Sequence, residues 1–147
     1  MQRFHILHGP FELADVRGRL GSTQAGAYAS FEGWVREHHD GRPVLGLTYD
    51  SYPSLAETEG NRVIAEAIAQ FAIIDAACAH RVGRLELGEL AVWVGVSAAH
   101  RDAAFAACRW IIDEIKSRVP IWKHEYYADG ETAWLHPVAD CKSGQHT

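Results

Sequence analysis

Two long stretches of this sequence repeat apolar side chains at the intervals of an amphipathic helix, and they constrain the fold more than any other feature. The first helix is expected from Leu55 to about Ala77, and the second from about Ala98 to the residue before Pro120. Segments with the alternation of strands precede, separate and follow the two helices. This order predicts an α+β fold in which two long helices pack on a largely antiparallel sheet.

The strands are predicted from alternating or aromatic-rich runs that are bounded by turn residues. They span residues 25–35, 44–52, 80–87, 90–97, 121–126 and 132–135, after a brief helical pattern at residues 11–20. Pro53 ends the second strand, and Ser54 followed by Glu57 has the spacing of a capping box at the start of the first long helix. The polar segment 37–43 is expected to be an exposed loop.

Length and composition favour one globular domain over residues 1–147, with a flexible tail at residues 138–147. Hydrophobic residues make up 48% of the chain. The formal net charge of −5 gives no reason to expect general binding to nucleic acid or anionic membrane, which needs a basic surface, but it leaves room for a local basic pocket. No stretch approaches the roughly 18 apolar residues of a membrane-spanning helix. The amino terminus also lacks the apolar run of a signal peptide, so the cytoplasm is the expected location.

The three cysteines, Cys78, Cys108 and Cys141, are odd in number and form no Cys-x-x-Cys pair. A disulfide framework or a thiolate zinc site is therefore not expected. Cys78 and Cys108 lie in alanine-rich stretches and are predicted to be buried core residues. The adjacent His38 and His39 have poor chelating geometry, and no phosphate-loop, dinucleotide-binding or metalloprotease motif occurs. We expect neither a metal nor a cofactor in this chain.

Two basic clusters stand at the ends of predicted strands. Arg36 follows the strand at 25–35 and, taken alone, fits an ordinary exposed arginine. His100 and Arg101 lie where a strand leads into the second helix. Free backbone N–H groups at a helix start attract anions, and two basic side chains there oppose the helix dipole unless an anion offsets them. An anion-binding role for His100 and Arg101 is thus as well supported as a structural one.

Two lysines flank the proline-directed reversal that follows the second helix. Lys116 lies in the last helical turn, where a lysine favours the helix dipole and is usually solvated, and Lys123 lies in the next strand. The reversal can bring the two ammonium groups together, and their repulsion would make one of them easier to deprotonate. Strand alternation places Lys123 and Glu125 on one face, and Trp122 and His124 on the other.

Five blocks of the sequence resemble, in the same order, the large subunit of molybdopterin synthase, and they lie within about residues 26–134. The blocks are Ala29–Arg36, Leu47–Pro53, His80–Gly83, Val94–Arg101 and Ile115–Glu125. The last two are the most specific, because they contain Ser-Ala-Ala-His-Arg and then Lys-x-Arg-x-Pro-x-Trp-Lys. The resemblance implies a single domain with an α/β-hammerhead-like arrangement.

The resemblance also implies roles for individual residues. Lys116 matches the family's principal catalytic lysine, and Lys123 matches its second essential lysine. The family's anionic substrate pocket is lined by residues that match Trp34, Val35, Arg36, His100, Arg101, His124 and Glu125. His124 departs from the common pattern, in which a second basic residue follows the lysine, and this weakens the positive field slightly. We expect the two lysines, the two arginines and His100 to converge on one pocket.

The implied activity is a sulfur transfer that builds the molybdopterin dithiolene. Sulfur comes from the thiocarboxylate at the Gly-Gly carboxyl terminus of a small ubiquitin-like subunit and is added to cyclic pyranopterin monophosphate. The family assembles as a homodimer at the centre of a heterotetramer. Two other functions stay open: a non-catalytic binding partner of a ubiquitin-like protein and, with weaker support, a phosphate-ester hydrolase that uses the anion site at His100 and Arg101.

Overall fold

The computed structural model describes residues 2–135, so the predicted tail at 138–147 lies outside the described residues. The elements are β1 (Phe4–Leu7), α1 (Leu13–Arg17), the 3-10 helix η1 (Gly18–Leu20), β2 (Ala27–Trp34), β3 (His38–His39), β4 (Arg42–Ser51), α2 (Pro53–Gln70), β5 (Asp75–Arg81), β6 (Gly83–Glu86), β7 (Leu90–Ala98), α3 (Arg101–Arg118), β8 (Ile121–Tyr127) and β9 (Thr132–Leu135). The α+β prediction is confirmed. In the described part of the chain, no helix is long and apolar enough to cross a membrane.

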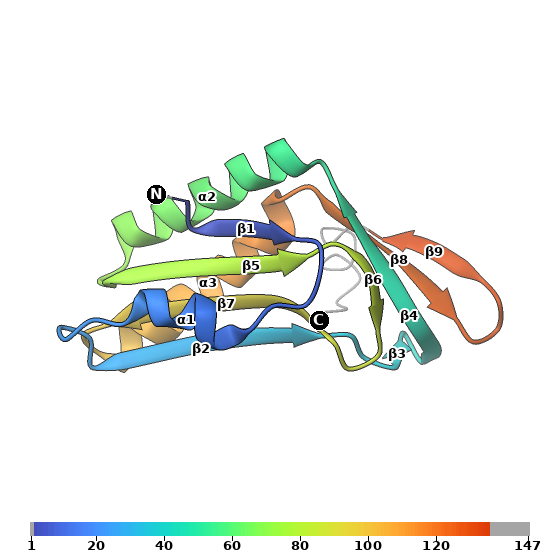
Figure 1. The fold of residues 1–147 in the computed structure, drawn as a ribbon, viewed down its shortest axis with the longest axis horizontal. Coiled ribbons are helices and arrows are strands. Elements are labelled where there is room, and N and C mark those ends of the chain that lie inside the picture. Colours follow the sequence, from blue (N-terminus) through green and yellow to red (C-terminus); the bar gives the residue numbers. More distant parts are fainter. Residues whose placement is uncertain (1, 136–147) are drawn as a thin grey trace.

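The strands form two sheets rather than one (Figure 1). The first has the order β1-β5-β7-β2, in which β1 pairs with β5 in parallel and the other pairs are antiparallel. The second has the order β3-β4-β8-β9, and β6 also pairs with β4. Figure 1 shows the second sheet beside the end of the first at which β2 and β5 finish. Elements from both sheets therefore meet at this end.

The two long helices cover one face of the first sheet, α3 over β2 and β7, and α2 over β1 and β5. Their buried faces follow the predicted apolar stripes, and Ala104, Ile111 and Ile115 of α3 lie in the core. Cys78 is fully buried, as predicted, and so is most of Cys108. The other face of the sheet is partly covered by α1 and η1, which pack against Trp93. Burial of these apolar surfaces is the main force that holds helices and sheet together.

Several predicted boundaries are wrong. The first long helix ends at Gln70, because residues 75–77 pair with β7 as the start of β5. Apolar residues in such a short run fit a buried strand as well as a helix, so periodicity could not separate the two. The capping box does not form: Tyr52 is the N-cap, Pro53 occupies the first turn, and no side chain caps the helix. Strand β1 was not predicted at all.

The segment predicted to be an exposed loop also differs from expectation. His38 and His39 form the short strand β3 against β4, and the side chain of His39 is buried. Phe105 falls in the apolar repeat of the second predicted helix, so the sequence favours its burial, but it is 65% exposed. Two histidines in a polar, glycine-containing segment give no apolar signal for a strand, which explains why sequence reasoning missed the burial of His39.

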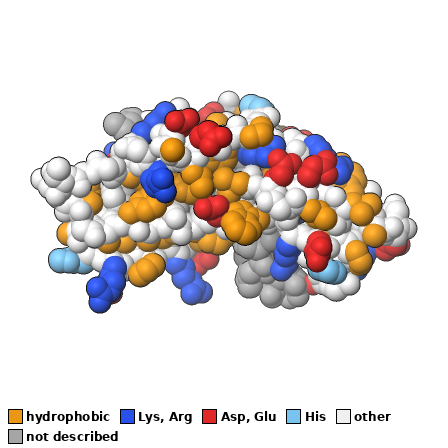
Figure 2. All heavy atoms as spheres, turned by 60° about the horizontal axis from the view of Figure 1, so that its bottom comes forward, with side chains coloured by type: hydrophobic (Ala, Val, Ile, Leu, Met, Phe, Trp, Pro, Cys, Tyr) orange, Lys and Arg blue, Asp and Glu red, His pale blue; other side chains and the backbone are white. Residues whose placement is uncertain are grey.

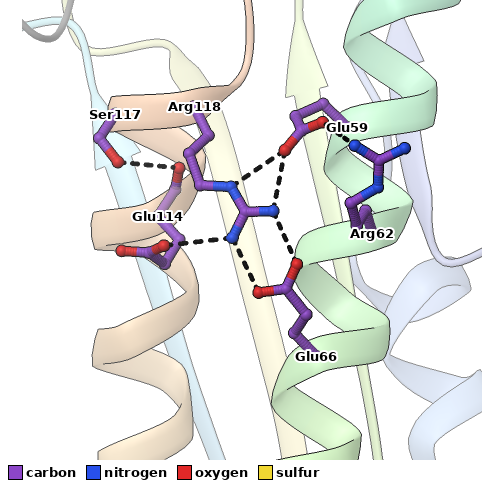
Figure 3. Close-up of polar contacts among 6 residues, drawn as sticks. All are labelled: Glu59, Arg62, Glu66, Glu114, Ser117 and Arg118. Atoms are coloured by element: carbon purple, nitrogen blue, oxygen red, sulfur yellow. Dashed lines mark hydrogen bonds and ion pairs between the residues drawn. The ribbon is translucent and has the colours of Figure 1, made fainter.

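Arg118, the last residue of α3, joins the two long helices through charged hydrogen bonds (Figure 3). Its guanidinium donates to Glu59 at 2.8 Å and to Glu66 at 2.7 Å on α2, and to Glu114 at 3.2 Å on its own helix. These bonds lower the pKa of Glu66 and raise that of Arg118. A planar guanidinium shared by three carboxylates fixes the end of α3 against α2.

Replacement of Arg118 by alanine is expected to lower the free energy of unfolding by about 1 to 2 kcal/mol, because it leaves three carboxylates close together without their shared cation. Chemical denaturation followed by circular dichroism measures the change. Arg109→Ala is the matched control on the same helix, because Arg109 is 85% exposed and lies 3.7 Å from Asp113. The control should stay within about 0.5 kcal/mol of the parent. An equal loss of unfolding free energy in both variants would contradict a stabilising role for the hydrogen bonds of Arg118.

Candidate functional site

The candidate site lies where α3, β5 and the second sheet meet. Helix α3 closes with the N–H of Val119 donating to the carbonyl of Ile115 at 3.1 Å, and Pro120 follows. The carbonyl of Pro120 accepts from the N–H of Tyr52, so the reversal is attached to the start of α2. Strand β8 then begins at Ile121. The predicted reversal between Lys116 and Lys123 is therefore present.

Lys123 lies on the buried face of β8 and is only 4% exposed. Burial alternates along this strand, with Lys123 and Glu125 inside and Trp122 and His124 more exposed, which confirms the predicted alternation. Lys123 stands directly opposite Tyr49 of β4 in the antiparallel register. Directly opposite residues project to the same face of a sheet, so the lysine and the tyrosine are side by side.

His80 links this strand pair to α3. Its imidazole packs edge-on against the ring of Tyr49, with ring centroids 4.8 Å apart and planes at 83°. Burial lowers the pKa of His80 to about 4, against the hydrogen bond to Arg81, and the nearby positive charge of Lys116 acts in the same direction as burial. Lys116 itself is half-buried in the last turn of α3. Both lysines thus lie around the Tyr49–His80 contact.

Glu125 occupies a buried network next to Lys123 on β8. Its Oε1 lies 2.9 Å from Nδ1 of His39 and accepts a hydrogen bond from the Tyr127 hydroxyl at 3.1 Å. Burial and the adjacent Glu125 carboxylate raise the pKa of Tyr127 to about 12, so this hydroxyl keeps its proton. The guanidinium of Arg42 stacks over the Tyr127 ring at 3.7 Å. In this structure Glu125 anchors strands β3 and β8 to each other.

His124 points to the other side of β8. It lies between the rings of Tyr126 and Trp134, at centroid distances of 4.9 and 4.4 Å. Its Nε2 is buried and finds no hydrogen-bond partner within residues 2–135. The expected lining residues His124 and Glu125 therefore face opposite sides of one strand, and only Glu125 shares a face with Lys123.

The expected site residues at the end of β2 also differ from one another in burial. Val35 is 4% exposed and packs in a small core with Leu47, Leu85 and Ala91, whereas the ring of Trp34 is 60% exposed. Arg36 follows them and is exposed. Because β2 ends beside the start of β7, Arg36 stands at the same end of the first sheet as His80.

His100 and Arg101 lie at the opposite end of the molecule. His100 is the N-cap of α3 and Arg101 its first residue, and both are exposed. Lys116 lies 15 residues further along the same helix, which is about 22 Å at the usual helical rise. The prediction that all five cations converge on one pocket is therefore wrong for a single chain, although Lys116 and Lys123 do share one region.

Comparison with known proteins identifies the family of this chain. The family model described as MoaE protein matches residues 6–118. This chain belongs to the MoaE family. It is 45% identical to the molybdopterin synthase catalytic subunit of Thermoplasma volcanium over 82% of this chain and 88% of the relative. It is 43% identical to the protein of the same name from Pyrococcus abyssi over 82% of both chains. The predicted family is confirmed.

Solved structures of the MoaE family have the same fold. Molybdopterin synthase from Staphylococcus aureus superposes with a TM-score of 0.86 and 31% identity, over 92% of this chain and 98% of that one. A chain from the complex of subunits 1 and 2 of the Helicobacter pylori molybdopterin-converting factor superposes with a TM-score of 0.73 and 20% identity, over 90% and 89% of the two chains. At that lower identity the second likeness supports the fold alone.

The candidate site contains residues that sequence reasoning did not assign to it. His80 and Tyr49 belong to the resembling blocks His80–Gly83 and Leu47–Pro53, but neither is among the predicted site residues. The spacing between β4, β5 and α3 carries no signal that these segments meet, because the contact depends on how two sheets pack. Over the part of the chain that the structure describes, no group of three or more His, Cys, Asp and Glu side chains could hold a metal ion.

The low pKa of His80 predicts a specific loss of stability in acid. Its folded value of about 4 lies below the usual 6.5, so the unfolded chain takes up a proton first as the pH falls. Between about pH 6.5 and 4 the free energy of unfolding should fall by roughly 3 kcal/mol from this residue. Denaturant titrations over this range measure it. In His80→Gln the pH-dependent part should shrink, whereas parallel curves for both proteins would contradict the assignment.

Proposed function

We propose that this chain is the sulfur-transferring subunit of a molybdopterin synthase and that Lys116 and Lys123 carry the reaction. Its substrates are cyclic pyranopterin monophosphate and the thiocarboxylate at the carboxyl terminus of a small ubiquitin-like partner. The observation that carries this proposal is that two lysines on separate elements lie around one buried Tyr49–His80 contact. The names of the curated relatives support the reaction class.

The two lysines suit a reaction between two anions. A thiocarboxylate and a phosphate ester repel each other, and a buried or half-buried ammonium group attracts both in surroundings where water screens little. When the sulfur attacks a substrate carbon, a C–S bond forms and the displaced oxygen needs a proton. A lysine ammonium can supply that proton and then recover it from water. The bond between sulfur and the partner's carbonyl carbon breaks afterwards by hydrolysis, and the partner ends as a carboxylate.

Assembly with a second protein is supported by the surface. Within residues 2–135, the exposed large apolar side chains are Tyr28, Trp34, Leu45, Tyr52, Leu55, Leu87, Phe105 and Trp134. Figure 2 shows apolar side chains exposed between acidic and basic ones over much of one face. Single exposed apolar residues are ordinary, but large ones such as Trp34 and Trp134 are candidates for contact with another subunit. The curated relatives are named catalytic subunits, which supports a second, different subunit for this chain as well.

The split of the basic residues supports a homodimer in which each site is shared. Arg36 and both lysines lie at one end of the folded molecule, and His100 and Arg101 lie at the other end. A two-fold axis that places the two copies antiparallel would bring His100 and Arg101 of the second copy to the lysines of the first. This arrangement would complete the anion pocket that a single chain leaves open.

Lys116→Ala is expected to reduce sulfur transfer about 100-fold or more, because the reaction loses a cation and proton donor. The assay mixes the purified chain with thiocarboxylated partner and cyclic pyranopterin phosphate, and follows dithiolene product. Lys116→Arg should recover much of the rate if a fixed charge is sufficient, and little if proton transfer is needed. Arg109→Ala, a distant cation on the same helix, is the control. Lost transfer with retained partner binding would exclude a purely binding role.

A mixing experiment tests the shared site. Lys116→Ala and Arg101→Ala chains are each expected to be nearly inactive alone. After unfolding and refolding together, half of the dimers should hold one copy of each, and each such dimer has one intact site. The mixture should therefore recover about a quarter of the parent activity. Activity that stays at the level of the separate variants would place Arg101 outside the site or the whole site in one chain.

A further inference from the structure

A cavity of about 340 Å³ lies on the face of the first sheet that α2 and α3 leave uncovered. Its walls come from η1 and from the starts of β1 and β5, together with Trp93 of β7. Pockets that bind small molecules commonly have volumes of about 300 to 1,000 Å³. Asp75, at the start of β5, stands five residues before His80, which is about 17 Å at the usual rise of a strand. Within one chain, the cavity is therefore separate from the region of Lys116 and Lys123.

The floor of this cavity is apolar. The ring of Trp93 is almost fully buried there and packs with Leu20 of η1 and Ala77 of β5. Its indole N–H donates to the hydroxyl of Tyr28 at 3.2 Å, so the one polar group of the ring is already satisfied. A side chain at Gly95, two residues further along β7, would clash with the Trp93 ring. The glycine thus gives the ring room to lie against β7, where it forms a broad apolar surface.

The rim of the cavity contains two arginines and one carboxylate. The guanidinium of Arg3 donates through Nε to Oδ1 of Asp75 at 2.7 Å, and the same oxygen accepts from the N–H of Ala76 at 2.8 Å. Within residues 2–135, the two Nη groups of Arg3 and the whole guanidinium of Arg19 have no hydrogen-bond partner. The ion pair therefore holds Arg3 in place and leaves its outer nitrogens for another acceptor. Arg19 adds a second cation, so the arginines outnumber the carboxylate although the chain is acidic overall.

We propose that this cavity binds a small molecule with a flat apolar body and one acidic group, such as an aromatic carboxylate. The body packs against the Trp93 ring and Leu20, and the acidic group accepts hydrogen bonds from Arg3 and Arg19. A guanidinium presents planar pairs of N–H donors that match a carboxylate. A neutral apolar ligand would leave the two arginines unused, and an inorganic anion would leave the apolar floor unused. The site goes beyond sulfur transfer and contains no residue assigned to that reaction.

Two fluorescent probes test the apolar floor and the basic rim separately. Anilinonaphthalene sulfonate has a flat apolar body and one acidic group, and phenylnaphthylamine has the same rings without the sulfonate. Fluorescence titration of the folded chain is expected to show one site for the sulfonate, with a dissociation constant of roughly tens of micromolar. The neutral probe should bind several times more weakly. Absence of sulfonate binding, or equal affinity for the two probes, would overturn the proposal.

Arginine variants test the rim. Arg19→Gln is expected to weaken binding of the sulfonate roughly tenfold, because it removes a charged donor, and to leave binding of the neutral probe unchanged. Arg17→Gln is the matched control, because Arg17 is also exposed and lies in α1 but does not line the cavity. It makes the same change in net charge and should leave the affinity for the sulfonate unchanged. An equal loss of affinity in both variants would show a general effect of charge and overturn the proposal.

Variants that fill the cavity locate the bound probe. Ala77→Leu enlarges a lining side chain on β5, and Val16→Trp enlarges one on α1. Each is expected to remove most binding of both probes while thermal unfolding stays cooperative. Where one filled variant fails to fold, the other decides. Undiminished sulfonate binding in a folded filled variant would place the probe elsewhere on the surface and overturn the proposal. None of these measurements involves sulfur transfer, so their outcomes are independent of the proposed function.

Discussion

The burial of Lys123 is the constraint on which the rest of the site depends. An ammonium group that is only 4% exposed is costly to remove from water, and the surrounding structure must offset that cost. On the strand pair of β4 and β8, Tyr49 stands opposite the lysine, and Glu125 lies two residues along on the same face. Glu125 is held in turn by His39 and Tyr127. The buried face of the second sheet thus carries Lys123 beside a hydrogen-bonded carboxylate network.

The end of α3 is fixed from two sides, and this links stability to function. Arg118 ties the last turn to α2, whereas Lys116, two residues earlier, lies on the sheet side near His80. Residues two apart on a helix point in nearly opposite directions. A helix end is usually its most mobile part, so a charged clamp on one side keeps the lysine on the other side in place. The sequence motif Lys-x-Arg-x-Pro combines both tasks with the reversal into β8.

Sequence reasoning succeeded where one element determines the outcome. The apolar stripe of α3, the reversal at Pro120 and the alternation along β8 follow from local periodicity, and the structure contains all three. It failed where the structure of a segment depends on its contacts with another element. The overrun of the first helix into β5, the burial of His39 and the contact between His80 and Tyr49 each depend on pairing across the fold. The resemblance pointed to Lys116 and Lys123 as the catalytic candidates, but it could not show that Val35 belongs to a core.

The same distinction explains why the five basic residues were expected in one place. A resemblance assigns roles to positions in the sequence. It does not say which copy of the chain in an assembly supplies each residue to a site. Arg101 and Lys116 stand at opposite ends of one rigid helix, and no movement within a folded chain can join them. A site that needs both must therefore be built between chains. In the proposed dimer, assembly supplies the missing cations only when two copies meet, so a chain with a formal charge of −5 can form a concentrated positive pocket that neither copy has alone.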